Sequence, residues 1–454
     1  MKYVALAICV LAVLPAYLIF RNSPYVRNNL WLALGLLPFL SMALPFLDVA
    51  LISWGEFWTG YVPGLQVSAI DVLCVVLYFS VSNRRNSIHY HLPFVLYLTA
   101  LSLSVFQAEM PLASTFSVWQ FARIYFVTVV IAKACTEPFE AQQLLKGMAI
   151  GLLFQFVTVL YQKFVGGMTQ PTGLFAHQNT LGLILHLVIC PHFAMLLAGQ
   201  RQLQSGATLL MGLAIAALIA SRASLGFAAF GSAMTYFVSI VHNWRTRKAA
   251  VGLAGAAAVA ILTPIALSSL ETRFEAAPLF EDRYDERAAF NRAAISILEA
   301  NPWGVGANHY SFVGKNYGYS VSAGVAPIEG SLNNIVHNAY LLAGAEAGYF
   351  GVFAFSFLMV FPILVAFRYA WAARGARDGD LLCGLGVGMA TVCLHSFYEY
   401  IVVIKEVQYV LAIIVGITFG YAHQVKTRQS RRTSKLLERR PLTRNLDDRA
   451  RASG

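Results

Sequence analysis

Five polar clusters interrupt an otherwise apolar chain, and their residue types suit group transfer from a phosphate-bearing substrate. Arginine binds phosphate and diphosphate groups through two parallel hydrogen bonds, and a neutral histidine can orient or deprotonate a hydroxyl. Such arginines can stabilise a leaving diphosphate in place of a divalent metal. The clusters are GLFAHQN (His177, Asn179), SRAS (Arg222), EDRYDERAAFNR (Arg283, Arg287), NPWGVGANHY (Asn308, His309, Tyr310) and VHNAY (His337, Asn338, Tyr340).

Each cluster also has an ordinary structural interpretation. Arg222 can extend its guanidinium to the lipid headgroups while its stem stays in apolar surroundings. Arg283 and Arg287 lie four residues apart beside several acids, which is also typical of a solvated helix face. His337 and Asn338 can simply cap the helix that follows them. Because all five clusters map to one face of the membrane, we favour a common site.

Two further polar residues are open to more than one interpretation. His177 can be an ordinary loop histidine. Arg123 lies near the middle of the apolar stretch TFSVWQFARIYFVTVVIA, a depth at which arginine needs a partner or a water-filled cavity. Glu346 and Glu399 are possible partners for it. Arg123 therefore has either a structural ion pair or a role in guiding an anion.

The elements that position these residues are predicted to be membrane-spanning helices. The chain is 58% hydrophobic and only 12% charged, about half the charge of a soluble protein. Apolar windows long enough to cross a bilayer recur throughout, and they are continuous rather than alternating. We predict an all-α polytopic membrane protein with about 12–14 spans. The windows are 3–20, 29–47, 64–82, 92–106, 115–132, 143–165, 179–199, 207–220, 223–241, 249–269, 337–367, 381–398 and 401–421.

The distribution of basic residues predicts how these spans are oriented and divided. Short loops rich in Lys and Arg should face the cytoplasm, and in this chain they alternate with loops of the opposite kind. The N-terminus is then outside and the C-terminus inside. The predicted regions are a transmembrane bundle of about ten helices (1–269), an extracytoplasmic loop domain (270–336), C-terminal transmembrane helices (337–421) and a basic, disordered cytoplasmic tail (422–454).

The extracytoplasmic segment is the one insertion long enough to have structure of its own. From Glu286 to Ala300 its apolar residues follow helical spacing, and Asn301-Pro302 ends that pattern. The segment is acidic overall, with five basic residues against eight acids. A D-x-D motif, Asp378-Gly-Asp380, falls instead in a predicted cytoplasmic loop, so we expect neither a metal nor any other cofactor at the site.

The C-terminal tail is strongly basic. Between Lys426 and Arg451 it holds ten Lys and Arg residues against three acids, a net charge of +7. Such a tail is typical of a disordered segment that contacts anionic membrane lipids. A nucleic-acid partner is not expected, because no aromatic residues are interleaved with the charges.

Three segments resemble the O-antigen ligase/polymerase family of bacterial envelope enzymes. They are SRASLGF, RAAFNRAAISILEANPWGVGANHY and VHNAYLLAGAEAGYFGVF, and the resemblance extends from about residue 175 to 370. Its pattern is a Ser-Arg after one helix, then a long outer loop with arginines and a P-x-G-x-G turn, and finally H-N-x-Y-L and E-x-G-x-x-G. Gly348 and Gly351 are expected to allow close helix packing.

The resemblance implies a GT-C-like membrane glycosyltransferase in the bacterial inner membrane, with its active site facing the periplasm. Its donor would be an undecaprenyl-diphosphate-linked glycan, and its acceptor lipid A–core or a growing glycan. His337 is then the catalytic base or acceptor-orienting group. The diphosphate would be held by Arg222 with Arg283 or Arg287. The supporting residues are Asn338, Tyr340, Asn179, His177 and Arg123.

Two alternatives stay open at this point. A ligase transfers finished polymer to lipid A–core, whereas a polymerase of the same family adds repeat units to a lipid-linked chain. We favour the ligase slightly. From a different class, the chain could be a transporter or flippase of a lipid-linked oligosaccharide, which Arg123 and the helix count fit. The outer arginines and His337 fit that class less well, because transport sites tend to lie near the membrane midplane.

Overall fold

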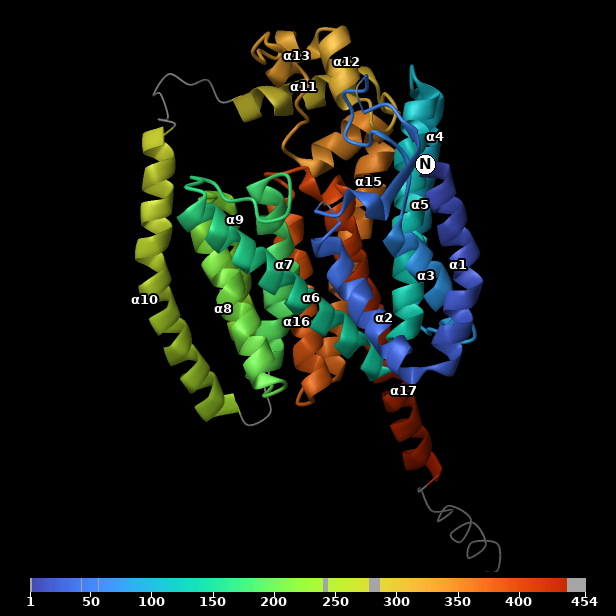
Figure 1. Cartoon of the computed structure of the whole chain (residues 1–454), viewed down its shortest axis with the longest axis vertical. Helices are drawn as coiled ribbons and strands as arrows, with labels where there is room; N and C mark the ends of the chain where they lie inside the picture. The colour runs from blue at the N-terminus through green and yellow to red at the C-terminus, as the bar shows by residue number, and fades with distance from the viewer. Residues whose placement is uncertain (1, 42, 56, 240–243, 277–285, 439–454) are drawn as a thin grey trace, which may run out of the picture.

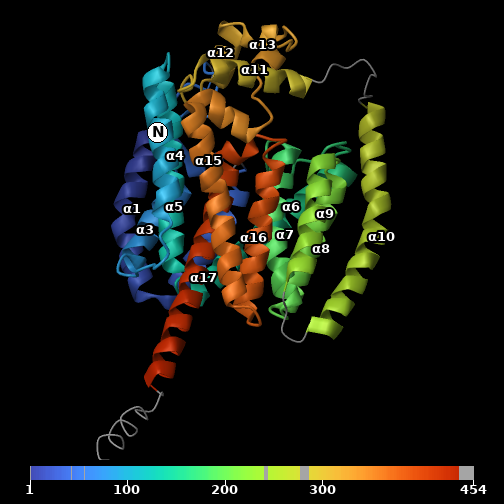
Figure 2. The same cartoon turned by 180° about the vertical axis from the view of Figure 1, so that it is seen from behind.

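The computed structural model describes residues 2–41, 43–55, 57–239, 244–276 and 286–438. Over these residues the chain is a bundle of long helices capped at one end by the short helices α11 (Glu286–Ala300) to α14 (Glu329–Leu332) (Figure 1, Figure 2). We call this end the loop end. The predicted all-α membrane fold is confirmed, and six of the described helices have both the length and the apolar composition to cross a bilayer.

The first half of the chain builds one side of the bundle. Proline occupies the first turn of three of its helices, where its missing N–H leaves no helical hydrogen bond unmade. A π-helical turn, η4 (Tyr161–Val165), extends α6, and the other short turns are 3₁₀. The long helices are α1 (Lys2–Asn22), α2 (Pro24–Leu36), α3 (Ala69–Val81), α4 (His91–Ser104), α5 (Pro111–Ala134), α6 (Pro138–Leu160) and α7 (Gln178–Leu197).

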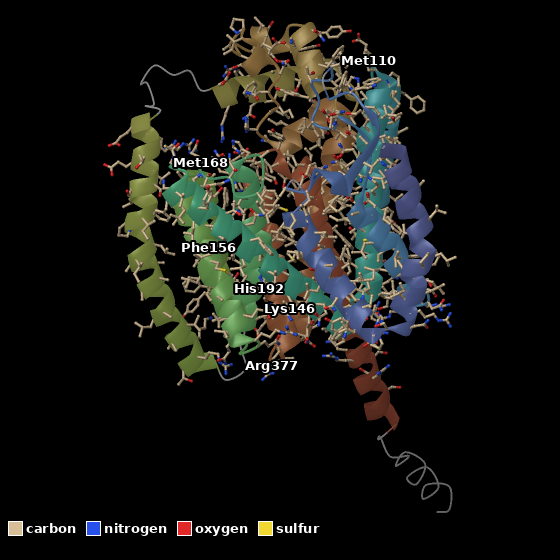
Figure 3. The ribbon with its side chains drawn as sticks, in the orientation of Figure 1. Met110, Lys146, Phe156, Met168, His192 and Arg377 are labelled. Carbon is tan, nitrogen blue, oxygen red and sulfur yellow. The ribbon has the colours of Figure 1, made fainter. Side chains whose placement is uncertain are left out.

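The second half contributes the remaining long helices and the cap. The helices are α8 (Gln202–Leu218), α9 (Arg222–Val238), α10 (Trp244–Ala276), α12 (Tyr310–Asn316), α13 (Tyr319–Ser322), α15 (Ala339–Ala372), α16 (Arg377–His395) and α17 (Lys405–Glu438). The predicted amphipathic helix coincides with α11, whose stripe from Ala289 to Leu298 is buried. Arg377, in a predicted cytoplasmic loop, lies at the end opposite the loop end (Figure 3).

One part of the tail prediction is wrong. Residues 422–438 were expected to be disordered, but α17 stays helical to Glu438 and projects from the bundle (Figure 1). The reason is continuity, since a helix that leaves the bundle needs no further nucleation and this stretch contains neither Gly nor Pro. Residues 439–454 lie outside the described residues.

The helices differ sharply in how deeply they are buried. In α7, 94% of the most apolar stretch is buried, against 6% in α10. α7 packs against α16, α8 and α9 at the centre of the bundle, whereas α10 stands at its edge in both views (Figure 1, Figure 2). α10 therefore presents most of its apolar surface outward, to lipid or to a ligand.

A two-stranded antiparallel hairpin is the one β element of the described chain. β1 (Asp48–Ser53) pairs with β2 (Gly64–Ser68), so residues 64–68 are strand although they fell in a predicted helical window. Ser68 then caps α3 in a reciprocal arrangement with Asp71, which fixes the change from strand to helix at that residue. The hairpin packs against α5 and α1.

α15 is interrupted near its start, and the glycine turn of the loop fills the interruption. Ala347 and Gly348 leave helical geometry, with a φ of +70° at Gly348. Backbone bonds run from Gly306 to the Glu346 carbonyl (2.9 Å) and from Tyr349 to the Pro302 carbonyl (3.1 Å). A Cβ at Gly348 would lie 2.2 Å from that Pro302 oxygen. Gly348 therefore serves this turn, a more specific role than the helix packing we expected.

Candidate active site

A buried carboxylate at the loop end gathers three side chains from distant parts of the chain. Glu399, whose side chain is 1% exposed, lies in the turn between α16 and the short helix η5 (Ile401–Val403). Its Oε1 accepts from Asn179 Nδ2 at 2.7 Å and from Arg287 Nη2 at 3.0 Å. Its Oε2 lies 3.0 Å from His337 Nδ1. We call these four residues the Glu399 cluster.

Asn179 is placed by the starts of two helices that meet beside the cluster. The His177 ring caps α7 by accepting from the backbone N–H of Asn179 at 3.2 Å. Ser221, the N-cap of α9, donates its hydroxyl to Asn179 Oδ1 at 3.0 Å. Helix N-termini carry partial positive charge, so this corner of the molecule favours anionic groups.

His337 is held at the start of α15. Asn338 caps this helix, accepting from the backbone N–H groups of Tyr340 and Leu341 at 3.0 and 3.1 Å. The capping interpretation therefore holds for Asn338, whereas His337 turns towards Glu399. The Tyr340 hydroxyl donates to the Cys393 carbonyl at 3.1 Å, which fastens α15 to α16.

Helix α11 lies against His337 and brings Arg287 to the cluster. The ring centroids of Phe290 and His337 are 6.2 Å apart, and the Tyr400 ring meets His337 edge-on at 5.5 Å. Arg287 shares a helix face with Phe290 because the two are three residues apart. The His337 side chain stays 24% exposed. Since a carboxylate only accepts hydrogen bonds, Nδ1 carries a hydrogen, and in the neutral ring Nε2 has a lone pair for substrate.

The cluster is electrostatically balanced around Glu399. Burial alone raises the pKa of this carboxyl, but the hydrogen bond from His337 and the charges of His337, Arg287 and His395 outweigh burial, so the pKa lies below its ordinary value. Burial lowers the pKa of His177, with opposing attraction from Glu399. At neutral pH Glu399 of the cluster is thus ionised, and His177 beside it is neutral.

Three arginines, one of them Arg287 of the cluster, lie close together. Arg222 is exposed, and its guanidinium sits 4.9 Å above the Phe274 ring. Arg273 donates to the Ala220 carbonyl at 2.7 Å and lies close enough to Arg222 and Arg287 for their charges to repel its own. Like charges gathered at one place are costly unless an anion neutralises them, so this grouping suits a diphosphate. Arg283, predicted to take part, lies outside the described residues.

The NPWGVGANHY segment does not join this site. His309 is fully buried, and its ring nitrogens meet the Met110 backbone N–H at 3.2 Å, the Ser114 hydroxyl at 3.2 Å and the Ala307 carbonyl at 2.9 Å. Asn308 pairs with the backbone of Val62 in the loop of the hairpin. This cluster fastens the outer loop to the hairpin and α5.

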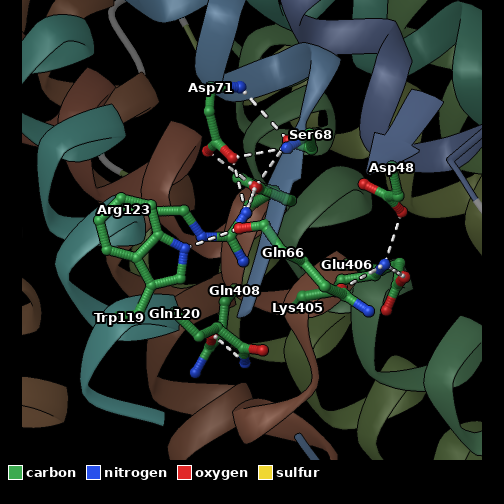
Figure 4. Close-up of polar contacts among 11 residues, drawn as sticks. Asp48, Gln66, Ser68, Asp71, Trp119, Gln120, Arg123, Lys405, Glu406 and Gln408 are labelled. Atoms are coloured by element: carbon green, nitrogen blue, oxygen red, sulfur yellow. Dashed lines mark hydrogen bonds and ion pairs between the residues drawn. The ribbon is translucent and has the colours of Figure 1, made fainter. Parts of the chain in front are cut away.

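The prediction that Arg123 pairs with Glu346 or Glu399 is wrong. Its guanidinium lies 2.6 Å from Asp71 of α3 (Figure 4). It also lies 3.1 Å from the Tyr409 hydroxyl, which donates to Asp71 at 2.8 Å. Glu346 instead accepts from the Tyr61 hydroxyl at 2.7 Å. Helix neighbours in space are not encoded by apolar windows, so the partner could not be chosen from the sequence. Because Arg123 is paired, it no longer favours the alternative that the chain is a transporter.

Glu399 and Arg273 are the site residues that the sequence prediction missed. Glu399 was considered only as a partner of Arg123, although it falls between two windows at the outer end of the predicted topology. That position was the available signal, because a carboxylate there must meet the other loop-end residues. Arg273 was not among the arginines predicted to bind the diphosphate. Within the described chain, no group of three or more His, Cys, Asp or Glu residues could hold a metal ion.

A large apolar groove runs along the bundle below the arginines. It has a volume of about 1240 Å³ and lies between α10 and the pair α8 and α9. Its walls include small residues of α10 such as Gly252 and Gly255, and larger ones such as Leu225 and Phe237. Ala266 and Leu267 bring the lining to within two turns of Arg273 on α10. The groove therefore has an apolar body and a cationic end.

Comparison with protein families identifies part of the chain. Residues 209–356 match a family model described as O-Antigen ligase, which confirms the resemblance read from the motifs. No curated protein matches the chain. The matched residues include Arg222, Arg273, Arg287 and His337 of the site, whereas Asn179 and Glu399 lie outside it. This family is enzymatic and acts on lipid-linked glycans as ligase or polymerase.

Proposed function

The chain carries an O-antigen ligase region, and on that premise we propose that it is an O-antigen ligase-like glycosyltransferase of the bacterial inner membrane. It transfers glycan from an undecaprenyl-diphosphate carrier to a lipid A–core acceptor at the periplasmic face. It needs no metal, and its C-terminal tail lies in the cytoplasm. We also propose the predicted regions, with boundaries after residues 269, 336 and 421.

The observation that carries this proposal is the pairing of Glu399 with two different kinds of group. It binds Arg287 through one carboxylate oxygen and His337 through the other, each at 3.0 Å. An imidazole oriented by a buried carboxylate is a general base, and a half-exposed guanidinium beside it can bind an anion. A site that removes a proton from a hydroxyl next to a diphosphate is what this reaction requires.

In the proposed reaction, an acceptor hydroxyl oxygen attacks the anomeric carbon of the donor glycan. A new carbon–oxygen bond forms there as the bond from that carbon to the diphosphate oxygen breaks. The hydroxyl proton passes to Nε2 of His337, and Glu399 stabilises the imidazolium. The bonding electrons leave with the diphosphate, whose added charge is met by Arg222, Arg273 and Arg287. The proton later returns to water or to the released diphosphate.

The apolar groove supports a lipid-linked donor. A polyprenyl chain is hydrocarbon throughout, so it can lie in the apolar groove beside α10 as it lies among lipid tails. Its diphosphate would then lie at the end of the groove near Arg222 and Arg273, with the first sugar close to His337. A soluble nucleotide-sugar donor would have no use for such a groove.

The test is a donor assay with purified protein. A polyprenyl-diphosphate-linked glycan and lipid A–core are mixed with the protein in detergent, with a chelator and without an energy source. We expect a new glycosidic product and free polyprenyl diphosphate, and we expect His337→Ala to form neither. Product that depends on added metal would overturn the metal-free mechanism, and no product from wild type would overturn the function.

The same chemistry serves a polymerase, and a gene deletion separates the two. Loss of a ligase leaves full-length polymer on the lipid carrier, whereas loss of a polymerase leaves acceptors capped with single repeat units. We expect the first pattern. The second would identify the acceptor as a growing glycan while leaving the roles of His337 and the arginines as proposed.

A further inference from the structure

The residues that carry Glu399 form a short connection whose two ends are both anchored. The connection runs from Ser396 to Ile404 between α16 and α17. At its first end, the Ser396 carbonyl accepts from the backbone N–H of Ala339, two residues after His337, at 2.9 Å. The start of α15 and the start of the connection therefore share a direct bond, and the position of the connection affects the His337–Glu399 contact.

At its second end, the connection is tied to the hairpin through Lys405. The Lys405 ammonium lies 2.5 Å from Asp48 Oδ2 on β1 and 3.1 Å from Gln66 Oε1 on β2 (Figure 4). The Lys405 and Asp48 side chains are only 20% and 14% exposed. A partly buried ion pair with a second acceptor is held in one geometry more firmly than a surface pair.

A third anchor comes from α5. The side-chain amide of Gln120 donates to the Val403 carbonyl and to Gln408 Oε1, both at 2.9 Å. Gln120 is 6% exposed, so water does not compete for these bonds. One amide thus fastens η5 and the first turn of α17 to α5.

The hairpin is itself fixed to the bundle, so it can act as a rigid support. The Trp119 indole of α5 donates to the Gln66 carbonyl at 2.7 Å. Ser68, at the end of β2, lies 2.8 Å from the Tyr409 hydroxyl of α17. These contacts join the hairpin to the same two helices that hold the connection. Five residues separate Lys405 from Glu399, and three of them form the short helix η5.

We propose that the hairpin is a positioning element of the active site, acting through Lys405 on Glu399 and through Glu399 on His337. Asp48 and Lys405 are then positioning residues, and Gln120 supports them. Only the effects on kcat that this inference predicts rest on the proposed function. A displacement of about 1 Å in a catalytic group can cost roughly 100-fold in rate, so remote anchors of this kind affect turnover.

The test compares Asp48→Asn and Lys405→Met with wild type and with Glu399→Gln. Each of the two variants is expected to lower kcat about 10-fold or more while KM for the lipid-linked donor stays within about twofold. Lys405→Arg keeps the positive charge, so it is expected to retain most of the wild-type kcat. In the Glu399→Gln background, neither variant should lower kcat further, because the carboxylate charge that it positions is already gone. The matched control is Lys315→Met, which removes an exposed ion pair with Glu329 on the outer loop.

A second readout does not depend on catalysis. Diethyl pyrocarbonate modifies histidine, and mass spectrometry gives the modification rate of His337 alone. We expect Asp48→Asn and Lys405→Met to bring this rate to the value of Glu399→Gln, while Lys315→Met keeps the wild-type rate. The proposal is overturned if these two variants react like wild type, or if Glu399→Gln does so. Absence of product from wild type would overturn the proposed function alone, since the modification rates would still be measured.

Discussion

Two arginine–carboxylate pairs in this molecule have opposite surroundings. Arg123 and Asp71 lie 2.6 Å apart with side chains only 6% and 11% exposed, and Tyr409 bonds to both of them. Arg287 and Glu399 lie 3.0 Å apart, but the Arg287 side chain is 49% exposed while Glu399 is 1% exposed. The first pair is enclosed within the bundle, and the second opens at the loop end.

The difference shows how the same ion pair can serve structure in one place and function in another. Arg123 is met by buried partners that neutralise its charge, so it stabilises the packing of α3, α5 and α17. Arg287 has donors left over and other arginines nearby, and its carboxylate also orients an imidazole. A cation with spare donors beside a base is where a diphosphate substrate can bind.

The largest effect on the exposed pair's site is expected from removing the His337 imidazole. His337→Ala is expected to lower turnover by about 10²- to 10⁴-fold, because the base that accepts the hydroxyl proton is lost. The variant should still fold, because Asn179 and Arg287 continue to pair with the buried Glu399. Initial rates of glycan transfer measure the effect, with His91→Ala at an exposed histidine as control. Near wild-type activity in His337→Ala would refute the assignment.

Removing a half-exposed arginine should have the next largest effect. Arg287→Ala is expected to reduce turnover about 10²-fold, because a preorganised donor to the leaving diphosphate is lost. Arg287→Lys keeps the charge without the planar fork and should recover part of the rate. Arg292→Ala on the same helix is the control, since Arg292 donates to the Ala323 carbonyl instead. Equal losses at positions 287 and 292 would mean that α11 is merely destabilised.

The enclosed Arg123–Asp71 pair should affect stability and leave turnover nearly unchanged. Asp71→Asn leaves the Arg123 charge buried without its counter-charge, and we expect a stability loss of roughly 3–5 kcal/mol. The turnover of the molecules that remain folded should stay close to wild type. Thermal unfolding in detergent measures the first quantity, and rates normalised to folded protein measure the second. A large loss of turnover at full stability would place Arg123 in substrate handling.

Acidification gives the smallest expected effect. Because the folded-state pKa of Glu399 lies below its ordinary value of about 4.5, the unfolded chain binds this proton more readily. Ionised Glu399 therefore stabilises the fold fully above that value, and the stabilisation is lost as pH falls through the lowered folded-state pKa. The Tm difference between wild type and Glu399→Gln should be constant near neutral pH and narrow below about pH 4.5. A difference that persists in acid would contradict the ionised state.

The sequence predicted the helical elements well because apolar windows and charged loops are local signals. The positions of α7, α9, α11 and α15 follow from apolar periodicity and from capping residues such as Asn338. The residues gathered at one end also followed from topology, since His177, Arg222, Arg287 and His337 all begin or adjoin helices there.

What the sequence could not predict was the pairing between helices. The choice of Asp71 for Arg123 depends on α3 lying beside α5, and the role of Glu399 depends on how the connection after α16 is folded. The short strand at residues 64–68 was hidden in an apolar window because its residues suit helix and strand alike. Gly348 was read as a packing residue because its φ of +70° is not visible in the sequence.

The most direct measurement of the central claim is labelling of a cysteine beside the Glu399 cluster. Tyr398, whose side chain is 57% exposed, precedes Glu399, and its carbonyl accepts from Arg287. In intact spheroplasts, Tyr398→Cys should react with a membrane-impermeant maleimide, and added polyprenyl diphosphate should slow that reaction. Leu203→Cys, 89% exposed at the opposite end, should react only after permeabilisation. Labelling of Tyr398→Cys only after permeabilisation, or at a rate indifferent to polyprenyl diphosphate, would contradict the account.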